Sequence, residues 1–231
     1  MTSDQYKTLA AEVKVGAGFS RSFGVDASRG NAFMATMRMA GATGNEGDSR
    51  RMALMIGEAV GRVGFSKADD VLQAVSSFAM NVSRTSMASG NIAGYAGTLS
   101  SLVASGRPGL DVAGSAALLS RINSSIENGG SAGEAGQNFM LAAIGRPMGL
   151  SPIRTRMQLQ KGAFGIGAGG MSNIQMIMSG LRKQYSGLPE EFMFNAGANL
   201  LGINESQFAA FAKHGSGGQL TLEIDDGAAA R

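Results

Sequence analysis

The fold class is clearest in residues 52–72, which read MALMIGEAVGRVGFSKADDVL. Apolar side chains in the first half recur at spacings of three, four and seven residues, as on one face of a helix. Gly64 ends that periodicity, and Ser66 precedes a second apolar pattern that continues to Val82. A glycine can end a helix in the left-handed conformation, and a serine can cap the next one. The stretch therefore predicts two helices joined by a tight corner at Gly64.

A corner made of a glycine, an apolar residue and a capping residue occurs five times. The five corners are Gly24-Val25-Asp26, Gly64-Phe65-Ser66, Gly109-Leu110-Asp111, Gly149-Leu150-Ser151 and Gly202-Ile203-Asn204. Ser66 to Asp69 and Asn204 to Gln207 also have the spacing of a capping box. The first four corner glycines lie 40 or 45 residues apart, a period typical of paired-helix repeats. Two interpretations stay open: a degenerate repeat of helix hairpins, or the corners that any compact helical domain needs.

Helical periodicity extends over most of the chain, so we expect an all-α fold, a multi-helix array of short helix hairpins. Residues 219–225 alternate apolar and polar side chains, which is compatible with a single C-terminal strand. We divide the chain into a main helical array (1–161), a glycine-rich hinge (162–170), C-terminal helices (171–214) and a flexible or partner-dependent tail (215–231).

The hinge is expected because five of the nine residues in 162–170 are glycine, whose backbone is costly to order. Helical periodicity flanks the segment, with Ile153 and Met157 before it and Ile174 and Leu181 after it. A hinge would exchange its amide hydrogens rapidly. The competing interpretation is close packing against a neighbouring helix, which glycine also permits.

Composition removes most conventional catalytic chemistry. The 231 residues include no cysteine and one histidine, His214, which excludes thiolate metal sites, disulfides and multi-histidine sites. Only 16% of the residues are charged, against about 25% in an average domain, and glycine and methionine are abundant. The net charge of +3 is only a weak indication of nucleic-acid binding. We assign no catalytic, cofactor-binding or metal-ligating residue, and we expect no cofactor.

A catalytic glutamate is the main enzymatic alternative. Glu205 precedes a serine, as the single catalytic glutamate of lytic transglycosylases often does, but the other motifs of those enzymes do not surround it. A divergent site would use Glu205 or Glu58. The positions of Glu205, Glu190 and Glu191 at predicted helix starts also have a structural explanation, because carboxylates favour the helix dipole there. His214 has the same explanation at a helix end.

Methionine and arginine give two further signals. The methionine-rich segments around Met37 and Met178 fit core filling, a plastic surface or a membrane contact. Arg50-Arg51 and Arg154-Thr-Arg156 fit solvated faces, or contacts with acidic partners or phosphate.

Several segments carry a resemblance to a known family. Residues 23–38 read FGVDASRGNAFMATMR and residues 48–61 read DSRRMALMIGEAVG. Shorter matches are Asn91-Ile-Ala-Gly-Tyr95, Gly106-Arg-Pro-Gly-Leu110, Gly145-Arg-Pro147 and Leu150-Ser-Pro152. Together they resemble the helical middle of phage tail tape-measure proteins, over about residues 10–180.

The resemblance implies a non-enzymatic structural domain, an internal segment of a tape-measure protein that acts in tail assembly and genome ejection. It implies other tail proteins of the virion as partners (tail tube, baseplate or tail tip), together with self-association, membrane contact during ejection and DNA contact. The location would be the tail lumen of the virion, and the host cytoplasm during assembly. The alternatives are a divergent peptidoglycan-lytic, transglycosylase-like domain and a membrane-active helical domain.

Overall fold

The computed structural model describes residues 3–85, 91–167 and 170–215, and it confirms the all-α fold class. The α-helices of these residues are α1 (Ser3–Phe23), α2 (Ala27–Met39), α3 (Glu46–Val63), α4 (Ala68–Thr85), α5 (Ile92–Ala104), α6 (Val112–Glu127), α7 (Gly133–Met140), α8 (Pro152–Leu159), α9 (Asn173–Gln184), α10 (Glu190–Leu201) and α11 (Glu205–Ala210). A 3₁₀ turn, η1 (Phe65–Lys67), and two π-helical turns, η2 (Leu141–Gly145) and η3 (Phe211–Gly215), complete the set.

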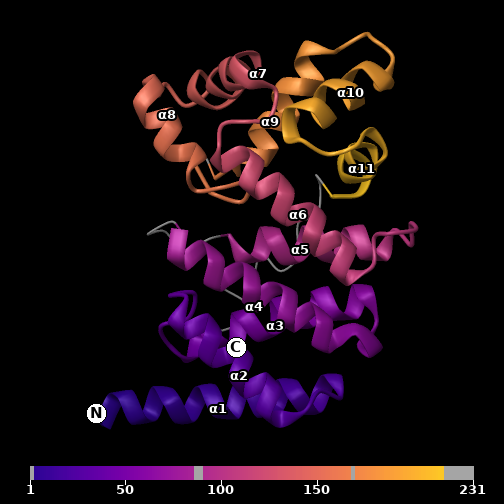
Figure 1. The fold of residues 1–231 in the computed structure, drawn as a ribbon. Helices are drawn as coiled ribbons and strands as arrows, with labels where there is room; N and C mark the ends of the chain where they lie inside the picture. Colours follow the sequence, from indigo (N-terminus) through magenta and orange to yellow (C-terminus); the bar gives the residue numbers. More distant parts are fainter. Residues whose placement is uncertain (1–2, 86–90, 168–169, 216–231) are drawn as a thin grey trace.

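Helices α1 to α6 stack as three consecutive hairpins. Each odd-numbered helix packs on the next odd one, and each even-numbered helix packs on the next even one. Figure 1 shows the result as layers, from α1 and α2 at one edge to α5 and α6 in the middle. Two parallel rows of helices are the arrangement of a hairpin repeat. The period near 40 residues therefore corresponds, in this part of the chain, to stacked helix pairs.

All five corner glycines have a positive φ, as the sequence predicts. The values are 66° for Gly24, 103° for Gly64, 77° for Gly109, 61° for Gly149 and 65° for Gly202. Each corner ends one helix of a pair and starts the other. These positions favour glycine because a side chain strains the backbone at positive φ.

Four of the five predicted capping residues accept a hydrogen bond from the helix that they start. These residues are Asp26, Asp111, Ser151 and Asn204. The predicted capping box of Asn204 and Gln207 is confirmed, because the Gln207 amide donates to Asn204 Oδ1 at 2.8 Å and the Asn204 amide donates to Gln207 Oε1 at 3.3 Å.

The predicted cap at Ser66 is wrong. Ser66 lies inside η1, where the Lys67 amide donates to the carbonyl of Gly64 at 3.0 Å, and α4 begins only at Ala68. Among the described residues, Ser66 donates and accepts no side-chain hydrogen bond, and Asp69 Oδ1 has no hydrogen-bond partner. The 3₁₀ turn thus replaces the capping box expected with Asp69.

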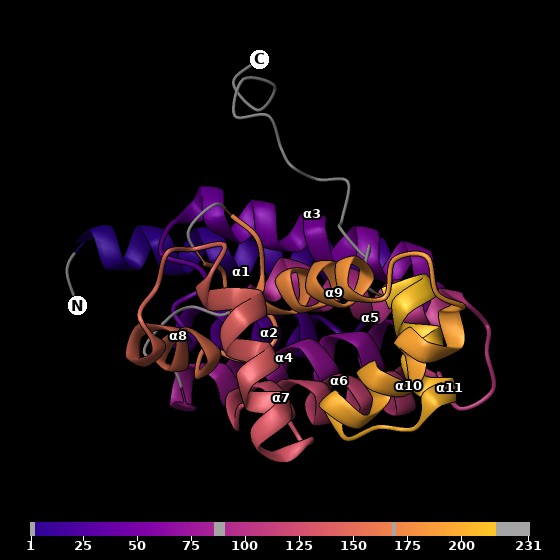
Figure 2. The ribbon, with the colours of Figure 1, turned by 90° about the horizontal axis from the view of Figure 1, so that it is seen from above.

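The remaining helices form an upper layer on α5 and α6. Helices α7, α8 and α9 meet around η2, while α10 packs on α6, and η3 packs on α5. Figure 2 shows α8 at one end of this layer and α11 at the other. One cluster of buried side chains extends from Phe19 to Ala212, on both sides of the glycine-rich segment. The division at residues 162–170 stays a prediction.

At the C-terminal end, the described residues stop at Gly215. The expected strand at residues 219–225 lies outside the described residues, as does the rest of the tail after Gly215, which itself ends η3. Within the described residues, the β-type pairing is a single antiparallel bridge between Ile166 and Ser172.

Candidate functional site

The two glutamates of the enzymatic alternative lie apart. Glu58 of α3 is paired with Arg62 one helical turn later, and Glu205 is the exposed first residue of α11. Figure 1 places α3 and α11 in different layers of the molecule. The structure therefore does not bring Glu58 and Glu205 into one site.

Other charged candidates lie on the surface in helix-end contacts. Glu190, in the first turn of α10, forms an ion pair with Lys213 at 3.4 Å. The ammonium group of Lys213 also lies 5.4 Å from the centre of the Phe194 ring. His214 is exposed in η3, and Arg50 forms an ion pair with Glu46 of the same helix. Exposed ion pairs of this kind contribute little stability, and these contacts have the structural explanation that the sequence suggested.

In the described ranges, no group of three or more histidine, aspartate or glutamate side chains is arranged to hold a metal ion. No helix within those ranges has both the length and the hydrophobicity that crossing a membrane would require.

The most distinctive polar feature is a group of uncharged side chains around the glycine-rich segment, of which Gln158 and Asn173 are buried and Asn123 is half-buried. We call Asn123, Gln158 and Asn173 the amide cluster. The Asn173 amide group donates to the carbonyl oxygens of Gln158 at 2.8 Å and Gly162 at 2.7 Å. Gln158 Nε2 donates to Asn173 Oδ1 at 2.9 Å. Through these side chains, α6, α8 and α9 are connected to the glycine-rich segment (162–170) that joins α8 to α9.

Backbone hydrogen bonds complete the attachment of the glycine-rich segment. The Ala163 amide donates to Asn123 Oδ1 at 2.9 Å, across 40 residues of sequence. The Asn173 and Ile174 amides donate to the carbonyls of Gly165 and Ala163, at 3.0 and 2.9 Å. Gly162 combines φ +74° with a close approach, because a Cβ atom there would lie 2.2 Å from Asn123 Oδ1. Glycine at this position serves close packing, whether or not the segment also acts as a hinge.

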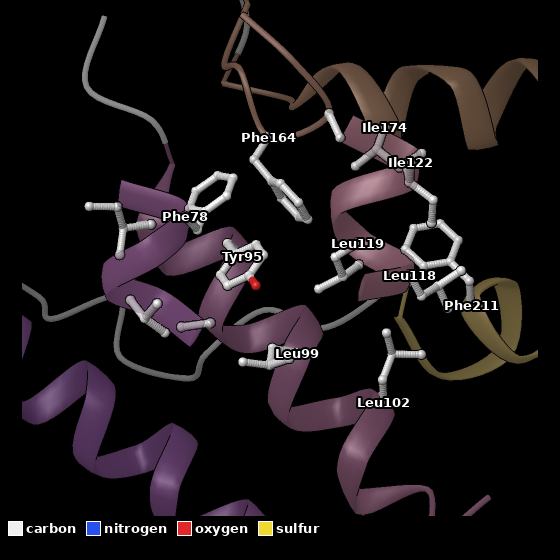
Figure 3. Packing of buried hydrophobic residues seen from close by; sticks show 14 of the residues in the cluster. Phe78, Tyr95, Leu99, Leu102, Leu118, Leu119, Ile122, Phe164, Ile174 and Phe211 are labelled. Atoms are coloured by element: carbon white, nitrogen blue, oxygen red, sulfur yellow. The ribbon is translucent and has the colours of Figure 1, made fainter. Parts of the chain in front are cut away.

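An aromatic contact anchors the same segment in the core. Phe164 is buried with its ring edge-on to Phe78 and Tyr95, at centroid distances of 5.5 Å to each, as Figure 3 shows. Phe78 and Tyr95 stack on one another at 4.1 Å. Burial raises the pKa of Tyr95 to about 12, so its hydroxyl stays neutral at physiological pH. The segment is therefore attached to α4 and α5 as well as to the amide cluster.

The amide cluster borders a polar cleft that contains a glutamate with a shifted pKa. Glu127, the last residue of α6, lines a cleft of about 320 Å³ with Asn128, Gln137, Arg156 and Gln160. Burial raises the pKa of Glu127, opposed by the hydrogen bond that Asn123 Nδ2 donates to Glu127 Oε1 at 2.7 Å. A carboxyl group with a raised pKa in a cleft can donate a proton, as a general acid must.

Sequence reasoning missed Glu127 and all three members of the amide cluster. Asn123 contacts the segment across 40 residues, and Gln158 and Asn173 pair across 15, so no local pattern indicates the bonds. One signal was present: Ser172 and Gln175 have the capping-box spacing and form that box at the start of α9. It would have placed Asn173 in a first helical turn directly after the glycines.

Comparison of the chain with protein-family models, with curated proteins and with solved structures gives no match.

Proposed function

We propose that the chain is a non-enzymatic structural domain of a phage tail tape-measure protein, which acts in tail assembly and in genome ejection. The observation that carries this proposal is the stack of helix hairpins, closed by glycine corners. Two of these corners, at Gly24 and Gly109, lie within the segments that resemble that family. A stack of hairpins presents long helical faces to partners and needs no catalytic group.

The mechanism that we propose is packing followed by release. In the compact state, neutral side chains of the amide cluster hold the glycine-rich segment. Hydrogen bonds between uncharged groups can be exchanged for bonds to water at a modest net cost of about 1 kcal/mol each. Once they break, the glycines permit large backbone changes. The helices on either side of the segment would then separate or extend.

The partners in this proposal are other tail proteins of the virion, namely the tail tube and the baseplate or tail tip, and further copies of the same protein. The chain would lie in the tail lumen of the virion, after assembly in the host cytoplasm. Contact with DNA and with a membrane would occur during ejection.

Mass spectrometry of purified virions tests the proposal. Peptides from this chain should be found in virions and in isolated tails of the phage that encodes it, and should be absent from isolated capsids. Their absence from purified tails would contradict a structural role in the tail.

A second candidate function, peptidoglycan lysis, is supported by one specific observation. Glycoside cleavage needs a carboxylic acid that donates a proton, and burial raises the pKa of Glu127 in its cleft. Within this alternative we favour Glu127 as the acid, because it lines a cleft, whereas Glu205 is exposed at a helix start and Glu58 is paired with Arg62.

Release of soluble fragments from purified peptidoglycan tests the second candidate. The structural proposal predicts no release by the purified chain. If release occurs and Glu127→Gln abolishes it while Glu205→Gln does not, the lytic activity replaces the structural proposal. Glu205→Gln serves as the matched control, because Glu205 is exposed at a helix start.

A further inference from the structure

Helix α8 presents two of its large apolar side chains, Ile153 and Met157, to solvent. Ile153 is 75% exposed and Met157 is 62% exposed, whereas Thr155, Gln158 and Leu159 are buried. An amphipathic helix of a globular protein normally has the opposite orientation, with its apolar stripe facing the core. Two large aliphatic side chains on one exposed face indicate a surface that contacts something apolar.

The geometry of the helix sets two arginines beside this apolar pair. At about 100° per residue, Ile153 and Met157 lie about 40° apart around the helix axis. Arg154 and Arg156 fall on opposite sides of them, each about 80° from the middle of the pair. Both arginines are exposed, and neither forms an ion pair with a residue that the structure describes. We call these four residues the α8 face.

The surrounding sequence is entirely basic in its charged residues. No aspartate or glutamate occurs between Glu134 and Glu190. The charged residues of that interval are Arg146, Arg154, Arg156, Lys161, Arg182 and Lys183. The carboxyl group that shares a cleft with Arg156 is Glu127 of α6. The α8 face therefore combines an apolar centre with a positive border.

We propose that the α8 face docks on the surface of a bilayer that contains anionic lipids. Ile153 and Met157 enter the boundary between headgroups and acyl chains, and Arg154 and Arg156 bind lipid phosphates on either side. Apolar burial and attraction to anionic headgroups are the two contributions that hold an amphipathic helix in a membrane interface. The proposal gives a site to the membrane contact that the proposed function includes, but its evidence is the exposure and charge of α8, so vesicle binding can succeed or fail separately from a role in the tail.

Other anionic partners fit the α8 face less well. A nucleic-acid backbone would pair with the arginines, but phosphates and sugars offer no apolar surface to cover Ile153 and Met157 between them. A lipid bilayer offers phosphates and hydrocarbon at the depths that long arginine side chains and aliphatic side chains reach together.

Sedimentation of the full chain with vesicles tests the proposal. We expect binding to vesicles of phosphatidylglycerol and phosphatidylcholine, weak binding to phosphatidylcholine alone, and loss of binding at high salt. Each of Arg154→Gln and Arg156→Gln should lower the partition coefficient about fivefold, and the double variant about 25-fold. The pair Ile153→Ser and Met157→Ser should lower it about tenfold or more.

Matched controls come from elsewhere on the surface. Leu54→Ser removes an aliphatic side chain that is 55% exposed on α3, and Arg107→Gln removes an exposed arginine at the Gly109 corner. Neither should change vesicle binding. All variants are compared at equal helicity by circular dichroism. Equal losses in the controls, or unchanged binding in the α8 variants, would overturn the proposal.

A site-specific probe gives a second readout that does not depend on affinity. The chain has no cysteine, so Ile153→Cys and the control Leu54→Cys can each be labelled at one position with an environment-sensitive fluorophore. The label at position 153 should shift to the blue on anionic vesicles, and the label at position 54 should not. A duplex DNA oligonucleotide and an acidic peptide serve as competing probes. Absence of the shift, or binding of either probe through the α8 face with no vesicle binding, would overturn the proposal.

Discussion

Replacing Asn173 with alanine is expected to destabilise the protein far more than any other removal of a single asparagine side chain at a helix start. Asn173 is fully buried, and its side chain makes three hydrogen bonds, to Gln158 twice and to Gly162 once. It is the first residue of α9, where alanine is compatible with the helix, so the decrease in the free energy of unfolding measures the loss of these bonds.

The size of the stability loss in Asn173→Ala depends on which hydrogen bonds are lost and which remain. The carbonyl of Gln158 keeps the Lys161 amide as a donor, and the carbonyl of Gly162 keeps the Gly165 amide. Gln158 Nε2, which loses Asn173 Oδ1, still donates to the carbonyl of Gly165 at 3.4 Å. No group is therefore left without any partner, and each lost bond counts at its net value of about 1 kcal/mol. With a contribution from the small cavity, Asn173→Ala should lower the free energy of unfolding by roughly 2 to 4 kcal/mol.

Urea unfolding followed by circular dichroism measures this loss, and Asn199→Ala is the matched control. Asn199 is exposed and donates to Asn195 on the surface of α10, so its replacement should change stability by less than about 0.5 kcal/mol. Hydrogen exchange should show that Ala163 and Ile174 lose protection first in Asn173→Ala. Equal stability of the two variants would refute the claim that the amide cluster holds the segment.

Three further outcomes are expected in unfolding experiments. Gly64→Val should lower the free energy of unfolding by about 1 kcal/mol or more, because φ is +103° there. Ser66→Ala should lower it by less than about 0.5 kcal/mol, because Ser66 lies inside η1. A larger loss for Ser66→Ala than for Gly64→Val would show that Ser66 is a cap after all. Asp111→Ala should cost about 1 kcal/mol by removing the acceptor of the Gly114 amide, and an unchanged urea midpoint would contradict the cap. Burial raises the pKa of Glu127 in the folded protein, so the protonated carboxyl stabilises the fold fully below its unfolded pKa of about 4.5, and this stability is lost as pH rises through the folded pKa. The free energy of unfolding of Glu127→Gln, relative to that of the wild type, should therefore rise between acid and neutral pH. A difference that does not change with pH would contradict this.

The local parts of the fold can be predicted from sequence because their causes are local. A glycine that must adopt positive φ and a capping side chain two or three residues before its donor both leave a short pattern. The corners at Gly24, Gly109 and Gly202 follow this rule. Ser66 is the exception, because whether a corner continues as a 3₁₀ turn depends on how the neighbouring helices pack.

Long-range features of the fold left no such pattern. Periodicity at Ile153 and Met157 indicates a helix correctly, but it does not tell which face the rest of the protein covers. In α8 the covered face carries Thr155 and Gln158 instead, because Gln158 bonds to Asn173 of α9. A buried amide is stabilised only by partners that the fold supplies. The amide cluster and the Glu127 cleft therefore required the structure.

Protease protection of intact tails tests the proposed role of the chain most directly. Purified tails are treated with a protease before and after the tube is opened, and peptides of this chain are quantified by mass spectrometry. A structural domain in the tail lumen should be protected in closed tails and degraded once the tube is opened. Complete digestion in closed tails, or absence of the chain from them, would contradict the account.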